Sequence, residues 1–210
     1  MIFYILLGFI ALLIVLNLFK KKKREDIISV YFGVPGSGKT TFAAYLARKD
    51  LKRKQRVFSN VPITGAFQMD CKNDLGKFQI VDARIIVDEA GIEYNNRKYK
   101  ELDQASIKFL KYHRHYQTAI DFFSQSHEDM DITIRRLAQK YYVVKKSLLP
   151  FFIVRKAIGR RVGIDENTKQ IIDEYYWKPF GSKWIFSPPL WKCFNTLSRE
   201  DLPEKEWVKW

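Results

Sequence analysis

The octapeptide GVPGSGKT at Gly33–Thr40 constrains the fold of this 210-residue chain more than any other feature. It matches the pattern G-x-x-x-x-G-K-[ST] at every fixed position, and it lies between an apolar run and a helical pattern. Glycines let the backbone wrap around a phosphate chain so that successive N–H groups point at its oxygens, and the helix adds its positive N-terminal end. The predicted nucleotide-binding residues are Gly33, Val34, Pro35, Gly36, Ser37, Gly38, Lys39, Thr40 and Thr41.

Four side chains are expected to act on the phosphates, on Mg²⁺ or on the attacking water. Lys39 reaches the β- and γ-phosphates as a mobile positive charge, and the Thr40 hydroxyl is a ligand of Mg²⁺. The apolar run IIV at 85–87 ends in two acids. Asp88 is expected to hold Mg²⁺, mostly through water, and Glu89 to polarise the attacking water. The expected cofactors are therefore ATP and Mg²⁺, with ATP hydrolysis as the reaction, and a strand ending in solvated acids is the alternative.

Three further side chains are candidates for the same site. Gln125 follows the apolar run at 119–124 and is expected to contact the γ-phosphate or to orient water, with a loop cap as the alternative. Arg135 and Arg136 lie on the next helical segment, and one of them is a candidate for stabilising charge on the γ-oxygens of a neighbouring subunit. The alternatives for this pair are surface charges or contacts to nucleic-acid phosphates. Asp82 is a weaker candidate for either acidic role.

Strand and helix patterns alternate along the chain. Strands separated by helices indicate a parallel sheet covered on both faces. The predicted fold class is therefore α/β, a P-loop NTPase with a mostly parallel sheet flanked by helices, with one N-terminal transmembrane helix before it and an aromatic-rich C-terminal tail after it. The predicted strands are 27–32, 56–61, 85–88, 119–124 and 141–145, and the predicted helices are 40–54, 101–116 and 129–140.

The stretch Ile2–Phe19 contains 18 uncharged residues. As a helix it is about 27 Å long, close to the ~30 Å hydrocarbon core of a bilayer. The basic run at 20–24 follows it, which places the N-terminus outside and the rest of the chain in the cytoplasm. A cleaved signal peptide would have a charged start and a small-residue cleavage site, and a core helix would have a polar face. We therefore expect a single-pass, uncleaved anchor.

The charge balance predicts a polyanionic partner. Lys and Arg number 37 against 23 Asp and Glu, a net charge of +14, and the body keeps +9 without the five charges of the basic run. Nucleic acid or an anionic lipid surface fits this excess, and a merely solubilising surface is the alternative. The two cysteines, Cys71 and Cys193, lack metal-site spacing and fit a reducing compartment.

The composition divides the chain into four parts. Residues 1–19 are the predicted transmembrane anchor, 20–26 a basic juxtamembrane linker, 27–174 the P-loop NTPase domain and 175–210 an aromatic-rich tail or subdomain. Ten of the last 36 residues are aromatic. This tail is expected to pack on its own domain, or to dock on a neighbouring subunit, the bilayer interface or single-stranded nucleic acid.

Three segments together resemble a known family: GVPGSGKT, IIVDEAG at 85–91, and KYHRHYQTAIDFFSQSHEDMDITIRRLAQKYY at 111–142. Over residues 27–146 the chain resembles the N-terminal domain of the zonular occludens toxin family, which includes the filamentous-phage assembly protein. WKCFNT at 191–196 is weakly similar to a short aromatic motif of that family. The family is similar to the ring-forming FtsK/HerA class of DNA-pumping ATPases. In the filamentous-phage members, however, the membrane segment follows the ATPase domain.

The resemblance implies ATP-driven assembly, packaging or extrusion of viral DNA at the inner or plasma membrane of the host. The DNA that the resemblance implies is single-stranded. It also implies a homo-oligomeric ring and virion-assembly proteins as partners. A membrane-tethered nucleotide switch that recruits partners without moving DNA is the alternative. A small-molecule kinase is a third possibility, but an arginine-rich lid is not evident, and Glu89 beside Asp88 favours water as the nucleophile.

Overall fold

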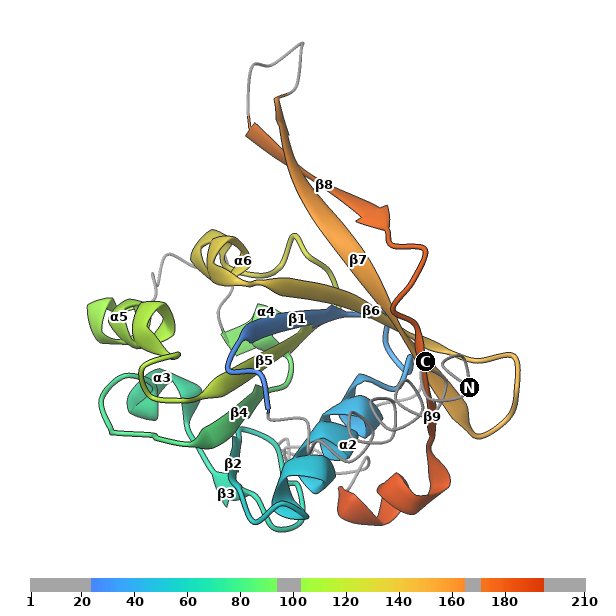
Figure 1. Ribbon diagram of the computed structural model, residues 1–210, viewed down its shortest axis with the longest axis horizontal. Coiled ribbons are helices and arrows are strands. Elements are labelled where there is room, and N and C mark those ends of the chain that lie inside the picture. Colours follow the sequence, from blue (N-terminus) through green and yellow to red (C-terminus); the bar gives the residue numbers. More distant parts are fainter. Residues whose placement is uncertain (1–23, 94–102, 165–170, 195–210) are drawn as a thin grey trace, which may run out of the picture.

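β1 lies inside a nine-stranded sheet whose strand order is β3-β2-β4-β5-β1-β6-β7-β8, with β9 beside β7 (Figure 1). The computed structural model describes residues 24–93, 103–164 and 171–194. The strands are β1 (Ile28–Phe32), β2 (Arg56–Ser59), β3 (Phe67–Gln68), β4 (Ala83–Val87), β5 (Ala119–Ser124), β6 (Lys140–Lys146), β7 (Phe152–Ile164), β8 (Ile171–Trp177) and β9 (Lys183–Phe186).

The half of the sheet from β3 to β6 is parallel, as predicted. Val30 of β1 lies opposite Phe122 of β5 on one side and Tyr141 of β6 on the other. Every residue of β1, β4 and β5 is buried, because helices cover both faces of these strands. The five apolar runs of the sequence are therefore five of these six parallel strands, with ends within two residues of the predicted ones, whereas the two-residue β3 was not predicted.

The other part of the sheet, β7 to β9, is antiparallel and was not predicted. β7 pairs with β6 along its first half and with β8 along its second half, and the β7–β8 hairpin extends beyond the rest of the domain (Figure 1). The proposed domain boundary at 174/175 falls inside β8. Up to Phe194, the tail packs on its own domain, because β9 pairs with β7 and the following 3₁₀ helix lies against α2.

The helices form one layer on each face of the sheet. Phe42 and Leu46 of α2 (Lys39–Leu51) pack on one face together with Leu190 of the 3₁₀ helix η1 (Pro188–Cys193). The other face is covered by four short helices: α3 (Cys71–Asp74), α4 (Ala90–Glu93), α5 (Gln104–Tyr112) and α6 (Ile132–Leu137).

Two of these helices are shorter than predicted, and an aspartate marks the beginning of each. The carboxylate of Asp103 accepts a bond from the backbone N–H of Ser106, and the carboxylate of Asp131 accepts one from the N–H of Thr133. Aspartate at this position satisfies the free N–H groups of a first turn, so α5 and α6 begin after it. Ser106 and Phe109 lie on the buried side of α5.

A buried ionic cluster lies between the sheet and α2, at the end of the sheet where β1 begins. Arg84 of β4 forms ion pairs with Asp50 of α2, at 2.6 Å, and with Asp121 of β5. Arg24 is also buried, and its Nη2 donates to Asp82 at 3.1 Å and to the carbonyl of Gln117 at 2.6 Å. Burial alone would lower the pKa of Arg84, but the neighbouring carboxylates raise it above its ordinary value.

Arg24 was assigned to the juxtamembrane linker, but its buried contacts make it part of the folded domain. The predicted anchor at 1–19 and the basic residues 20–23 lie outside the described residues. Within the described ranges, no helix is long and apolar enough to cross a bilayer.

Candidate nucleotide-binding site

The phosphate loop joins the end of β1 to the first turn of α2. The N–H of Gly33 donates to the carbonyl of Ser124 at the end of β5, which fixes where the loop begins. Gly38 precedes α2 with φ at 95° and provides no side-chain cap. A Cβ at Gly38 would lie 2.7 Å from Cγ2 of Ile153 on β7, so both the backbone angle and the contact with β7 require glycine. The N–H groups of the first turn are therefore left for an anion.

Lys39 lies in the first turn of α2, with its ammonium folded back over the loop. Nζ donates to the carbonyl of Gly33 at 2.7 Å and to that of Val34 at 3.3 Å. Desolvation lowers the pKa of Lys39, and the negative charges of Asp88 and Glu89 oppose this shift. The lysine charge is thus held at the loop, within electrostatic range of both acids.

Thr40 and Asp88 meet beneath the loop. The Thr40 hydroxyl donates to Oδ2 of Asp88 at 2.8 Å. Burial raises the pKa of Asp88 above its ordinary value. The hydrogen bonds that its carboxylate accepts from the Thr40 hydroxyl and from the N–H of Glu89 lower this pKa, but by less than burial raises it. A hydroxyl and a carboxylate side by side are hard oxygen ligands that fit Mg²⁺. Among the described residues no group of three or more His, Cys, Asp or Glu could hold a metal, so phosphate oxygens and water must complete such a site.

Glu89 follows directly after β4 and Asp88. Its φ of 51° is in the left-handed region, which costs a non-glycine residue roughly 1–3 kcal/mol. Its N–H donates to Oδ1 of Asp88 at 3.0 Å, and its side chain is exposed. This turn places an ionisable carboxylate at the edge of the sheet beside the loop.

Asn60 is a part of the site that the sequence analysis missed. It follows β2, the neighbour of β4. Its side-chain amide makes hydrogen bonds with both the N–H and the carbonyl of Asp88. Nδ2 donates to the carbonyl of Asp88 at 2.9 Å, and Oδ1 accepts from the N–H of Asp88 at 2.8 Å. A single Asn at the end of a predicted strand was the signal, but its role depends on the β2–β4 pairing.

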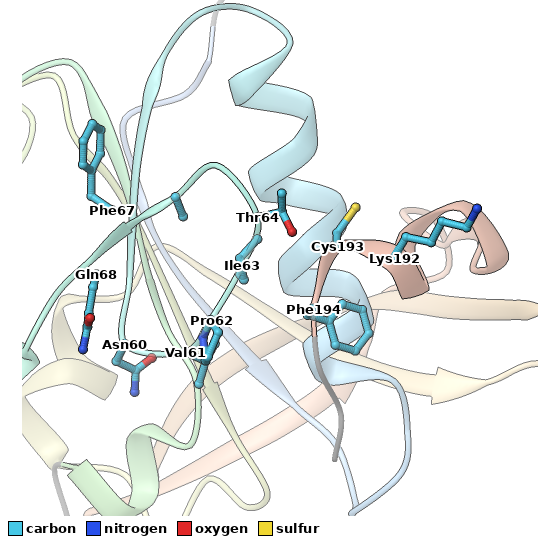
Figure 2. A pocket seen from close by; sticks show the side chains of 11 residues that line it. Asn60, Val61, Pro62, Ile63, Thr64, Phe67, Gln68, Lys192, Cys193 and Phe194 are labelled. Carbon is cyan, nitrogen blue, oxygen red and sulfur yellow. The ribbon is translucent and has the colours of Figure 1, made fainter. Parts of the chain in front are cut away.

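Two hollows border residues of this site. One, of about 670 Å³, lies beyond Asn60 between the segment 60–68 and the residues Lys192–Phe194. Figure 2 shows their side chains, with Asn60 and Gln68 on one side and Cys193 and Phe194 on the other. Lys192 is the one charged side chain among these lining residues. This hollow therefore lacks the features of a phosphate site.

The second hollow, of about 550 Å³, is lined by residues 32–37, which include the first five residues of the phosphate loop. Gln125 lines it, directly after β5, and β5 lies between β1 and β4 as the predicted role requires. Lys145 and Lys146 at the end of β6 line it as well, and these two cations were not predicted. A Cβ on Gly36 would lie 3.9 Å from Nζ of Lys146, so this second ammonium lies against the loop.

The other predicted residues fall into different environments. Arg135 forms an ion pair with Asp173 of β8 at 3.3 Å, with its side chain only 13% exposed, whereas Arg136 is exposed. Thr41 is buried within α2. Asp82 lies at the start of β4, at the end of the sheet opposite the loop, and is bound to Arg24. This location excludes Asp82 from the nucleotide site.

Comparisons with known proteins agree with this architecture. The sequence model of the zonular occludens toxin (Zot) family matches residues 63–159, a range that begins after the phosphate loop. The crystal structure of the N-terminal domain of zonular occludens toxin from Neisseria meningitidis is similar, with a TM-score of 0.53 and 17% identity. The similarity covers 80% of this chain and 98% of that one.

A second similar structure is B204, the DNA-packaging ATPase from Sulfolobus Turreted Icosahedral Virus, with a TM-score of 0.46 and 15% identity. The similarity covers all of the B204 chain and 76% of this chain. A comparison with curated protein sequences gives no match. The resemblance predicted from the sequence is confirmed: over residues 63–159 the chain is similar to the zonular occludens toxin family, and its fold is the α/β fold of that family's N-terminal domain.

Proposed function

We propose that this protein is an ATPase that drives assembly, packaging or extrusion of viral DNA at a membrane. The observation that carries the enzymatic part is the contact between Thr40 and Asp88 beneath a complete phosphate loop. Glu89 lies next to that pair at the same edge of the sheet. Similarity to the zonular occludens toxin family and the net charge of +14 support DNA as the substrate to be moved.

The residues of the site have distinct roles in this mechanism. Lys39 exchanges its bonds to loop carbonyls for bonds to the β- and γ-phosphates. Thr40 and Asp88 would hold Mg²⁺, and Asn60 keeps the backbone of Asp88 in place. Mg²⁺, when bound, neutralises charge on the phosphate oxygens. Glu89 polarises the attacking water, which Gln125 helps to orient.

The choice between a DNA motor and a nucleotide switch can be tested by measuring ATP hydrolysis with and without DNA. The expected result for the full-length protein in detergent is a several-fold stimulation by single-stranded oligonucleotides. Lys39→Ala should abolish both the basal and the stimulated rates, because the phosphates lose their main cation. A rate that DNA leaves unchanged would contradict the motor and favour a membrane-tethered switch that recruits assembly partners.

The membrane anchor is a separate part of the proposal and rests on the apolar stretch at 2–19 and the basic run after it. The protein should stay in the membrane fraction after a high-salt wash, and the ATPase domain should be protected from external protease in intact cells. Salt screens the attraction of Lys and Arg to anionic lipid but leaves an apolar helix in place. Release by salt would mean that the basic run merely adsorbs to the surface.

A further inference from the structure

The hairpin formed by β6 and β7 lies directly against the phosphate loop. A Cβ at Gly33 would lie 2.7 Å from the carbonyl oxygen of Val144 on β6, and one at Gly38 would lie 2.7 Å from Cγ2 of Ile153 on β7. Both distances are too short for a real Cβ, so glycine is what lets the loop approach the hairpin this closely. The hairpin is therefore a wall of the nucleotide site, in addition to β1 and α2.

The third glycine of the loop, Gly36, faces the end of β6. A Cβ on Gly36 would lie 3.9 Å from Nζ of Lys146, and the φ of Gly36 is 71°, in the left-handed region. Lys146 pairs with Ile153 across the hairpin, and residues that lie directly opposite each other have their side chains on the same face of a sheet. The ammonium of Lys146 is thus brought to the loop by the same face of the hairpin that packs against Gly38.

Lys146 carries a positive charge that the described part of the chain does not neutralise. Its side chain is exposed, and among the described residues it takes part in no ion pair. The hollow of about 550 Å³ beside the loop is lined by Lys145 and Lys146 and by no acidic residue. Lys39, by comparison, is buried and donates to two carbonyls of the loop. The ammonium of Lys146 is therefore available to an anion that binds at the loop.

Lys145, the preceding residue, lies on the opposite face of β6, because side chains alternate along a strand. Its Nζ lies 4.9 Å from the centre of the Trp177 ring on β8, a favourable contact between a cation and an aromatic face. Both lysines are exposed and both line the hollow, but Lys146 is the one whose ammonium lies against Gly36. Lys145 is therefore a matched control for Lys146.

We propose that Lys146 binds the phosphates of ATP as a second cation beside Lys39. Lysine binds phosphate as a point charge on a flexible stem, so it needs proximity to the loop rather than one fixed geometry. The inference rests on the proposed function in taking ATP as the ligand. It adds to that site a residue outside the loop motif, contributed by a different strand of the same subunit, and its test requires no hydrolysis.

The test measures binding of the non-hydrolysable analogue AMPPCP, with Mg²⁺, to the full-length protein in detergent at several salt concentrations. Lys146→Met keeps most of the aliphatic stem and removes the charge, and it should weaken binding roughly 10-fold or more. The affinity of this variant should also fall less steeply with added salt, because salt screens a charge contact that the variant no longer makes. Lys146→Arg keeps the charge and should retain most of the affinity.

Two variants that remove the same charge elsewhere serve as controls. Lys145→Met on the other face of β6 and Lys108→Met on α5, both at exposed positions, should bind AMPPCP within about twofold of wild type. Equal weakening in Lys145→Met and Lys146→Met would overturn the proposal, because net charge and not the contact at Gly36 would then explain the loss. An unchanged salt dependence in a weakened Lys146→Met would overturn it too, and would leave the side chain as packing for the loop.

The same measurement separates this inference from the proposed function. Wild-type protein should bind AMPPCP, and Lys39→Ala should lose that binding. If Lys39→Ala loses binding while Lys146→Met binds as wild type does, only the role of Lys146 is wrong. If the wild-type protein does not bind AMPPCP at all, the proposed ATPase activity and the role of Lys146 are both wrong.

Discussion

Replacing Glu89 by Gln is expected to lower the rate of ATP hydrolysis by roughly 10²–10⁴-fold while leaving nucleotide affinity close to wild type. Glu89 lies at the edge of the sheet, directly after the Asp88 that accepts a hydrogen bond from Thr40, and its side chain is exposed to solvent. Gln has the same shape and fits the same left-handed backbone turn, so the change removes only the base. Single-turnover hydrolysis and nucleotide binding, measured on the same preparation, separate the two effects.

Two variants make this result interpretable. Glu128→Gln, in the exposed loop before α6, removes an equal charge and should hydrolyse ATP at the wild-type rate. Lys39→Ala should lose nucleotide affinity as well as turnover, because Lys39 is the charge closest to the loop carbonyls. If Glu89→Gln hydrolyses ATP as fast as the unchanged protein, another group activates the water.

Replacing Arg136 by Ala is expected to lower turnover by roughly 10³–10⁵-fold without weakening nucleotide binding, if subunits assemble so that this arginine faces a neighbour's γ-phosphate. An arginine in that position stabilises charge that develops only in the transition state. Of the two candidates, Arg136 is exposed, whereas Arg135 is bound to Asp173 of β8. We therefore propose Arg136 as the residue acting in trans, and Arg135 as a residue that holds α6 against the hairpin.

Mixing subunits distinguishes action in trans from action within one subunit. Arg136→Ala and Lys39→Ala subunits should each be inactive alone, and mixed assemblies should regain activity where an intact arginine meets an intact phosphate loop. Arg135→Ala should instead lower the thermal midpoint, since it leaves Asp173 with one arginine partner, Arg160. Absence of rescue, in a protein that sediments as a monomer, would leave Arg136 as an ordinary surface charge.

The central parallel strands were predictable because burial on both faces leaves an apolar run in the sequence. β1, β4 and β5 are of this kind. β7 and β8 are not, because their hairpin extends beyond the domain and carries arginines and aromatic residues on exposed positions. No regular alternation of apolar and polar residues marks such strands in the sequence, and their pairing is known only from the fold.

The residues of the candidate site divide in the same way, into those that a sequence motif predicts and those that only the fold brings in. Lys39, Thr40 and Asp88 were predictable because the chemistry of phosphate and Mg²⁺ fixes both residue types and spacing. Asn60 and Lys146 have no motif, and they reach the site because β2 lies beside β4 and β6 beside β1. Which residues gather at the edge of a parallel sheet is decided by strand order, and strand order is a long-range property of the chain.

Arg24 sets the length of the tether between the domain and the proposed anchor. It is fixed by Asp82 and the carbonyl of Gln117, so only residues 20–23 separate the folded domain from Phe19. Fully extended, that link spans roughly 17 Å at 3.3–3.6 Å per residue. With the anchor proposed above, the end of the sheet where β1 begins would stay close to the bilayer. The phosphate loop, at the other end of β1, would then point toward the cytoplasm, where ATP arrives by diffusion.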